Sequence, residues 1–148
     1  MMRKKNVWIS GVAVFGVVAS LGLSARVVAG RQTPAPPPPT EADQLAALKD
    51  EGQVIYSREC ASCHAGDGTG DGAGPSLAGN TNLSNKDHVV RRILGGTGDG
   101  GMDPFGKVLT DRQVAAVATF VRNAWDNSNG VVLEADVKVI RAELAKPK

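Results

Sequence analysis

Two cysteines and a histidine stand together in the run Cys60-Ala61-Ser62-Cys63-His64. They include both cysteines of the chain, so a framework of long-range disulfides is excluded. The spacing is that of a c-type haem attachment site, because two thiols three residues apart can reach the two vinyl groups along one side of a porphyrin. The next residue, His64, would then lie under the iron and bind it as the proximal imidazole. We therefore expect one haem c, held covalently by Cys60 and Cys63.

Three other kinds of site use the same residue types. A thioredoxin-like redox pair requires a surrounding βαβ pattern, which the sequence lacks. A zinc site requires a fourth ligand, and the available His88 does not stand at the usual spacing. A disulfide between Cys60 and Cys63 leaves His64 without a role. Export of the chain, argued below, also favours haem attachment over these alternatives.

A haem iron with one histidine ligand can take a second axial ligand, and methionine there is typical of electron-transfer cytochromes. Apart from the first two residues, the chain has a single methionine, Met102, in the run GGMDPFG at residues 100–106. Glycine lets a backbone approach a flat cofactor closely, and proline stiffens such a loop. We expect Met102 to be the distal ligand, and the rival His88 to be a solvated surface side chain.

The glycine-rich run Gly66–Gly72 reads GDGTGDG and invites comparison with ion-binding loops. It lacks the closing glutamate of an EF-hand calcium loop and the Gly-Lys-Ser/Thr of a phosphate-binding P-loop. We interpret it as a flexible loop leaving the haem site.

The elements that must position these residues are all predicted to be helical. Apolar periodicity predicts helices over residues 41–56, 85–94, 110–125 and 134–145. The expected N-caps are Thr40 for the first helix and Ser84 or Asn85 for the second, and the third helix is expected to start at Leu109-Thr110-Asp111. Loops should cover residues 66–79 and 95–106, and no strand-like alternation is evident. The expected fold class is all-α.

The N-terminal segment, residues 1–29, has the layout of a secretory signal. A basic start is followed by an apolar run from Val7 to Leu23, and small residues precede a potential cleavage point before Gly30. The run is also long enough for an uncleaved membrane anchor. Both interpretations stay open, and in each the rest of the chain is exported.

A proline-rich linker is expected over residues 30–44, because residues 33–40 read TPAPPPPT. Proline at this density forms an extended, semi-rigid spacer. A spacer has a mechanical use between an anchor and a domain, which favours the anchor. The cytochrome domain is then expected over residues 45–148.

Composition excludes one large class of function. The formal net charge is +2, but four of the 17 basic residues lie in the N-terminal segment, and the rest of the chain is slightly acidic with its 15 acidic residues. Nucleic-acid binding needs a basic patch on the folded domain, so we expect none. Aromatic residues make up only 4% of the chain, which suits a small core completed by a buried cofactor.

The ordered set of motifs resembles the class I cytochrome c family in its short, monohaem bacterial form. The matching pieces span about residues 48–127, almost the whole expected domain. Around the haem motif they are, in chain order, Gly52 and Tyr56, GPSLAG at 74–79, VRRILGG at 90–96, GMDPFG at 101–106 and LTD at 109–111. The resemblance implies the class I fold, in which three to five helices surround one covalently bound haem.

The resemblance also implies roles for single residues. The carbonyl of Pro75 would accept a hydrogen bond from His64, a contact that orients the imidazole and tunes the metal. Met102 would be the distal iron ligand. Gly52 and Tyr56 would lie where the first helix crosses the helix over residues 110–125.

The sequence departs from the family pattern at Asp103, which separates Met102 from Pro104 where many relatives read Met-Pro directly. The loop register is kept. An acidic group so close to the distal ligand is expected to lower the reduction potential if it is not solvated.

By this resemblance the protein is an electron carrier and not an enzyme, with His64 and Met102 on the iron. Expected partners are a quinol-oxidising complex, a dehydrogenase or a terminal oxidase on the periplasmic, extracytoplasmic side of the membrane. Arg91, Arg92 and Lys107 are candidate docking charges, although each also fits an ordinary solvated side chain. The alternative is a haem enzyme or gas sensor with an open or labile sixth position.

Overall fold

The computed structural model describes residues 36–70, 73–99 and 101–147. The expected leader over residues 1–29 and the first part of the linker, residues 30–35, lie outside the described residues. The chain divides into two units, and the second, Pro37–Lys148, contains every helix described here.

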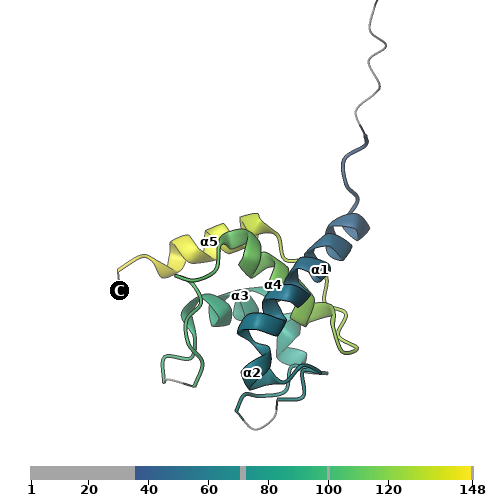
Figure 1. Ribbon diagram of the computed structural model, residues 1–148. Coiled ribbons are helices and arrows are strands. Elements are labelled where there is room, and N and C mark those ends of the chain that lie inside the picture. The colour runs from purple at the N-terminus through teal and green to yellow at the C-terminus, as the bar shows by residue number, and fades with distance from the viewer. Residues whose placement is uncertain (1–35, 71–72, 100, 148) are drawn as a thin grey trace, which may run out of the picture. The chain divides into compact units, whose positions relative to one another are not determined.

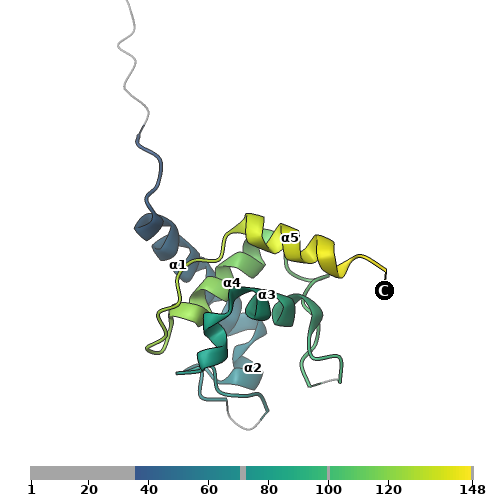
Figure 2. The same ribbon diagram turned by 180° about the vertical axis from the view of Figure 1, so that it is seen from behind.

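Only helices and loops occur in the described part of the chain (Figures 1 and 2). The elements are α1 (Glu41–Glu59), α2 (Ala61–His64), the 3-10 helix η1 (Thr81–Ser84), α3 (Lys86–Gly95), α4 (Asp111–Asn123) and α5 (Glu134–Leu144). The expected all-α class is confirmed. Among the described residues, no helix is both long enough and apolar enough to cross a bilayer.

Side-chain caps set the starts of three helices where the sequence predicts them. The Thr40 hydroxyl accepts from the Asp43 amide at the start of α1, and the Thr110 hydroxyl accepts from the Gln113 amide at the start of α4. In both cases the third residue of the helix bonds back to the cap, which completes a capping box. Asn85 caps α3. Because α1 begins at Glu41, residues 41–44 of the expected linker form its first turn.

Helices α1 and α4 cross at Gly52, as the family resemblance implies. A Cβ atom at Gly52 would overlap the carbonyl oxygen of Ala116 and stand 2.7 Å from Cβ of Phe120, so only glycine permits this approach. One turn later, the Tyr56 ring packs against Phe120 and Trp125 with centroid separations of 5.3 and 5.0 Å. The crossing therefore holds the C-terminal end of α1, where the Cys-x-x-Cys-His run begins, in a defined place.

The end of α4 differs from the expected helix over residues 110–125. The helix ends at Asn123, and the chain then reverses through Trp125 and Asp126, whose φ angles are 50° and 67°. The Asn123 side chain stabilises the reversal, because its oxygen accepts from the Gly130 amide at 3.1 Å. The reversal turns the Trp125 ring onto Gly68, where a Cβ atom would lie 2.6 Å from the indole.

Candidate haem site

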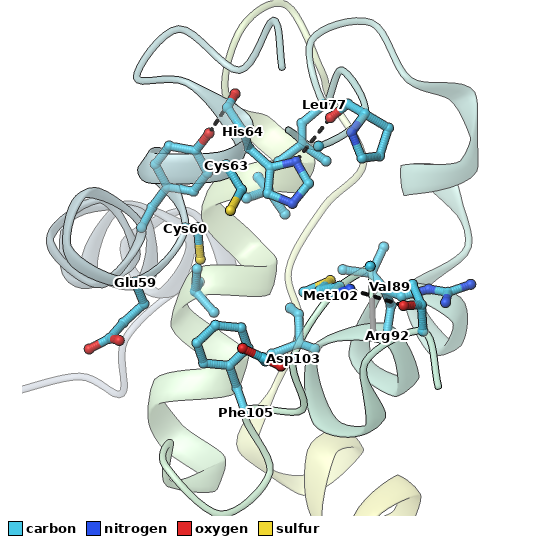
Figure 3. A pocket seen from close by; sticks show the side chains of 18 of the residues that line it. Glu59, Cys60, Cys63, His64, Leu77, Val89, Arg92, Met102, Asp103 and Phe105 are labelled. Carbon is cyan, nitrogen blue, oxygen red and sulfur yellow. Dashed lines mark hydrogen bonds between the residues drawn. The ribbon is translucent and has the colours of Figure 1, made fainter. Parts of the chain in front are cut away.

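A cavity of about 1050 Å³ lies among the C-terminal end of α1, α2, α3 and the loops on either side of α3. Its volume lies at the upper end of the range for pockets that bind small molecules and cofactors. All five predicted site residues line it: Cys60, Cys63, His64, Pro75 and Met102. Figure 3 shows the two sulfur atoms of the cysteines at one edge, with His64 and Met102 across the cavity from each other.

The cysteines reach the cavity because α1 stops at Glu59 and the one-turn helix α2 follows at once, with Cys60 between them. Both thiols are free. Burial, with smaller contributions from the neighbouring Glu59 and Cys63, raises the pKa of the Cys60 thiol to about 11. Cys60 is half-buried and Cys63 is exposed, and both line the cavity.

The His64 imidazole is held from behind by backbone carbonyls and glycine. Its Nδ1 atom lies 2.9 Å from the carbonyl oxygen of Pro75, which can only accept, so Nδ1 is the donor in this bond and Nε2 is the nitrogen left for another partner. A Cβ atom at Gly74 would stand 3.0 Å from the imidazole ring, so glycine allows the Pro75 loop to approach this closely. The Tyr56 hydroxyl donates to the carbonyl of Ala65 at 2.5 Å and fixes the backbone just after His64.

The loop that carries Met102 is fixed at both ends. The Met102 amide donates to the Thr97 hydroxyl at 2.9 Å, and the Thr97 amide donates to the Met102 carbonyl at 3.1 Å. Gly96, with φ 67°, brings α3 to its end against that carbonyl, where a Cβ atom would overlap it. Beyond Met102, the Phe105 amide donates to the Ile93 carbonyl at 2.9 Å. The half-buried Met102 side chain faces the cavity (Figure 3).

The cavity wall divides into apolar and polar parts. The apolar part comes from η1, α3, α4 and two loops, and it includes Leu77, Leu83, Val89, Ile93, Phe105, Val117 and Val121. The polar part includes Asn80, Asn82, His88 and Arg92.

The lining fits a haem in three respects. Two thiols at one edge suit vinyl groups, an imidazole and a thioether across from each other suit an iron, and the apolar side chains suit the faces of a porphyrin, with Arg92 available to its carboxylates. Within residues 36–70, 73–99 and 101–147, no group of three or more His, Cys, Asp or Glu side chains could hold a metal ion by itself, which the zinc alternative requires.

The other residues singled out in the sequence lie near the cavity or on the surface. His88 is exposed and reaches the cavity rim. Arg91 forms an ion pair with Glu143 of α5. The Arg92 guanidinium lines the cavity and donates to the Gly96 carbonyl at 3.3 Å, and Lys107 is exposed.

Asp103 and Asp99 are exposed acidic side chains that line the cavity beside Met102. Hydrogen bonds from the Thr97 hydroxyl and the Gly101 amide, with a smaller contribution from the Arg92 charge, lower the pKa of Asp99. Asp99 is therefore negative at neutral pH, and its bonds help to shape the turn before Met102.

Three contributors to the site are not evident from the sequence. The pair Gly74-Pro75 predicts a turn, but it does not reveal that Gly74 lies against the His64 imidazole. Gly96 is recognisable as a helix end, yet its contact with Met102 depends on the whole loop. The Tyr56 hydroxyl could be assigned only once its partner, Ala65, was located in space.

More than half of the chain matches a known protein family. A family model described as cytochrome c oxidase, cbb3-type, subunit III matches residues 47–121, which contain every residue of the predicted site. The chain belongs to this family of cytochrome c domains. The resemblance to cytochrome c is thereby confirmed. A domain of this family holds haem c covalently and carries electrons, and it is not itself catalytic.

Several curated proteins contain a similar cytochrome c segment. The fructose dehydrogenase cytochrome subunit of Gluconobacter japonicus is 36% identical over 107 residues, or 62% of this chain and 22% of the relative. The gluconate 2-dehydrogenase cytochrome c subunit of Pantoea cypripedii is 31% identical over 126 residues, or 70% and 28%. The alcohol dehydrogenase (quinone) cytochrome c subunit of Gluconobacter oxydans is 35% identical over 106 residues, or 61% and 22%. The chain thus spans less than a third of each relative.

Proposed function

We propose that this cytochrome c domain relays single electrons from a dehydrogenase, through a haem bound by Cys60 and Cys63, with His64 and Met102 as axial iron ligands. One observation carries the proposal: the two thiols, the imidazole and the thioether line a single cavity, with His64 and Met102 across from each other. When bound, the haem supplies the Fe(III)/Fe(II) couple.

The proximal side is arranged to present one nitrogen. Because Nδ1 of His64 is engaged by the Pro75 carbonyl at 2.9 Å, Nε2 is the atom left to bind a metal. An outer hydrogen bond of this kind fixes the ring and raises the basicity of the ligand.

The distal side presents a soft ligand on a braced loop. A thioether in that position favours the reduced iron and raises the potential, which suits an electron carrier. The reciprocal bonds between Met102 and Thr97 limit how far the loop can withdraw. Val117, Val121 and Phe105 add apolar side chains to the cavity wall, which would give a bound haem a surrounding of low polarity.

The polar part of the wall suits the two carboxylates of a haem. Arg92 supplies a positive charge and Asn80 and Asn82 supply amide groups. Arg92, Asn80 and Asn82 would hold the carboxylates, and Cys60 and Cys63 would form the thioethers.

A dehydrogenase is the proposed electron donor because the similar proteins are cytochrome subunits of fructose, gluconate and alcohol dehydrogenases. We place the domain outside the cytoplasm, with residues 1–29 as signal or anchor and the proline-rich run as spacer. Fractionation tests the anchor: recovery in a salt-resistant membrane pellet supports it, and recovery in the soluble periplasmic fraction contradicts it.

Haem staining after denaturing electrophoresis tests the covalent attachment. Co-expression with a c-type haem attachment system should give a stained band, and the double variant Cys60→Ser, Cys63→Ser should give none. An unstained wild-type band contradicts the proposal and favours a thiol or zinc protein.

Reduction kinetics test the partner separately. The oxidised cytochrome is mixed with membranes from the producing cells and supplied with fructose, gluconate or ethanol. Reduction that depends on one of these substrates supports a dehydrogenase donor. If none reduces the cytochrome while ubiquinol does, the dehydrogenase assignment is wrong and a quinol-oxidising complex replaces it.

A further inference from the structure

Helix α5 lies outside the segment that matches the family model, residues 47–121, yet it contacts the loop that leads away from Met102. The contact is made by Arg141. Its Nε atom donates to Asp111 at 2.6 Å, Nη2 donates to the Leu109 carbonyl at 3.0 Å, and Nη1 donates to the Gly106 carbonyl. All three nitrogens of one guanidinium are therefore used on the chain between the Met102 loop and α4.

Gly106 is the outer end of the Met102 loop. Its amide donates to the Leu94 carbonyl at 3.1 Å, so α3 holds this glycine from one side while Arg141 holds its carbonyl from the other. A Cβ atom at Gly106 would stand 2.7 Å from the Leu94 carbonyl oxygen, which shows how closely the loop lies against α3. Gly106 is thus held between the Leu94 carbonyl of α3 and the Arg141 guanidinium of α5.

We propose that Arg141 is a positioning residue for the distal side of the haem: it fixes Gly106 and thereby limits the movement of Met102 away from the iron. The inference rests on the proposed function, in which Met102 is a ligand. Charge-assisted hydrogen bonds are about twice as strong as neutral ones, and the planar fork of arginine can bridge several acceptors at once. The side chain is about one-third exposed, at 32%, so the bonds are partly shielded from water.

Two other ion pairs hold α5 without contacting the Met102 loop, and they supply a control. Lys86 pairs with Asp136 at 2.7 Å, and Arg91 pairs with Glu143. Val137 and Ile140 of α5 are also buried in the core. Loss of Arg141 should therefore free the loop while α5 stays docked.

The test uses the holoprotein and its variants Arg141→Gln, Arg141→Lys and Glu143→Gln. Three quantities are measured: the methionine–iron band at the red edge of the oxidised spectrum, the rate of CO binding to the reduced protein, and amide hydrogen exchange at Phe105 and Gly106. In Arg141→Gln we expect a weaker band, with CO binding and exchange roughly tenfold faster, the change expected when bonds to a charged group are lost. Glu143→Gln should match the wild type within about twofold.

Each outcome has one meaning. Wild-type rates in Arg141→Gln overturn the inference, and so do equal increases in Glu143→Gln, which would trace the effect to α5 docking in general. If Arg141→Gln does not accumulate, Arg141→Lys takes its place. This variant keeps a charge for Asp111 but cannot bridge the carbonyls of Gly106 and Leu109. Wild-type rates in Arg141→Lys would also overturn the inference. A wild-type protein without the methionine–iron band refutes the proposed ligation itself, and hydrogen exchange then still reports whether Arg141 holds the loop.

Discussion

The hydroxyl of Tyr56 donates a hydrogen bond of 2.5 Å to the carbonyl of Ala65, the residue that follows His64. Ala65 has a φ angle of 58°, an uncommon conformation for a residue other than glycine. The same hydroxyl lies 3.3 Å from the carbonyl oxygen of His64, so Tyr56 joins the crossing of α1 and α4 to the backbone at His64 and Ala65. The same ring lies in the aromatic cluster with Phe120 and Trp125.

Tyr56→Phe should keep the ring packing and remove this bond. We expect the free energy of unfolding to fall by about 0.5–1.5 kcal/mol, because a partly buried hydrogen bond is lost while the Ala65 carbonyl still accepts from the Gly68 amide. Urea unfolding of the holoprotein measures the change. Ser57→Ala is the matched control, since it removes a hydroxyl bond of 2.9 Å that stays within the exposed face of α1. The account of Tyr56 is wrong if both variants lose the same stability.

The pKa of Tyr56 gives a second test of its burial. Desolvation makes the largest contribution and the negative charges of Cys60 and Asp67 add to it, so the pKa of Tyr56 is raised from 10.0 to about 12. The fold therefore favours the neutral phenol, and this stabilisation is complete below pH 10 and lost as the pH rises towards 12. Tyr56 is the only tyrosine in the chain, so the ultraviolet difference spectrum between wild type and Tyr56→Phe reports on it alone. Titration at the ordinary tyrosine value would contradict a buried hydroxyl.

Gly52→Ala should destabilise the crossing of α1 and α4. The added methyl group would overlap the Ala116 carbonyl, and overpacking of this kind costs roughly 1–3 kcal/mol. Thermal unfolding compared with Gly95→Ala measures it, because a Cβ atom at Gly95 meets nothing within 4 Å. Gly95→Ala should change stability by less than about 1 kcal/mol. Equal melting temperatures for the two variants would refute the close approach.

The helices could be predicted from the sequence because their signals are local. Thr40 and Thr110 cap α1 and α4 through residues three positions away, and Asn85 caps α3 in the same way. Helices α2 and η1 have four residues each, too few for a periodic pattern to show. The apolar spacing that included Trp125 in α4 could not reveal the reversal at Asn123, which depends on side-chain bonds to the following loop.

The sequence singles out five residues that the structure brings to one cavity, but it does not reveal which contacts hold them there. The spacing of Cys60, Cys63 and His64 carries its chemistry within five residues. Arg141 acts on Gly106 across 35 positions, and no local pattern predicts such a contact. The predicted docking charge Arg91 is already engaged by Glu143, a pairing known only from the packing of α5 on α3.

Asp103→Asn should raise the reduction potential, because an exposed negative charge beside the distal loop favours Fe(III). A unit charge about 10 Å from the iron in a water-like medium shifts the potential by roughly 20 mV. Salt should reduce the difference, since exposed charges are screened. Potentiometric titration measures both, with Asp50→Asn as control because Asp50 is exposed on α1 and does not line the cavity. A lower potential in Asp103→Asn, or an equal shift in Asp50→Asn, contradicts the effect of Asp103 on the haem.

Ligation of the iron by Met102 is the central claim, and the oxidised absorption spectrum tests it most directly. Wild type and His88→Ala should both show the methionine–iron charge-transfer band at the red edge of the spectrum. Met102→Ala should lose the band and bind CO rapidly when reduced. A wild-type spectrum without the band, or a band that persists in Met102→Ala and disappears in His88→Ala, would contradict the account.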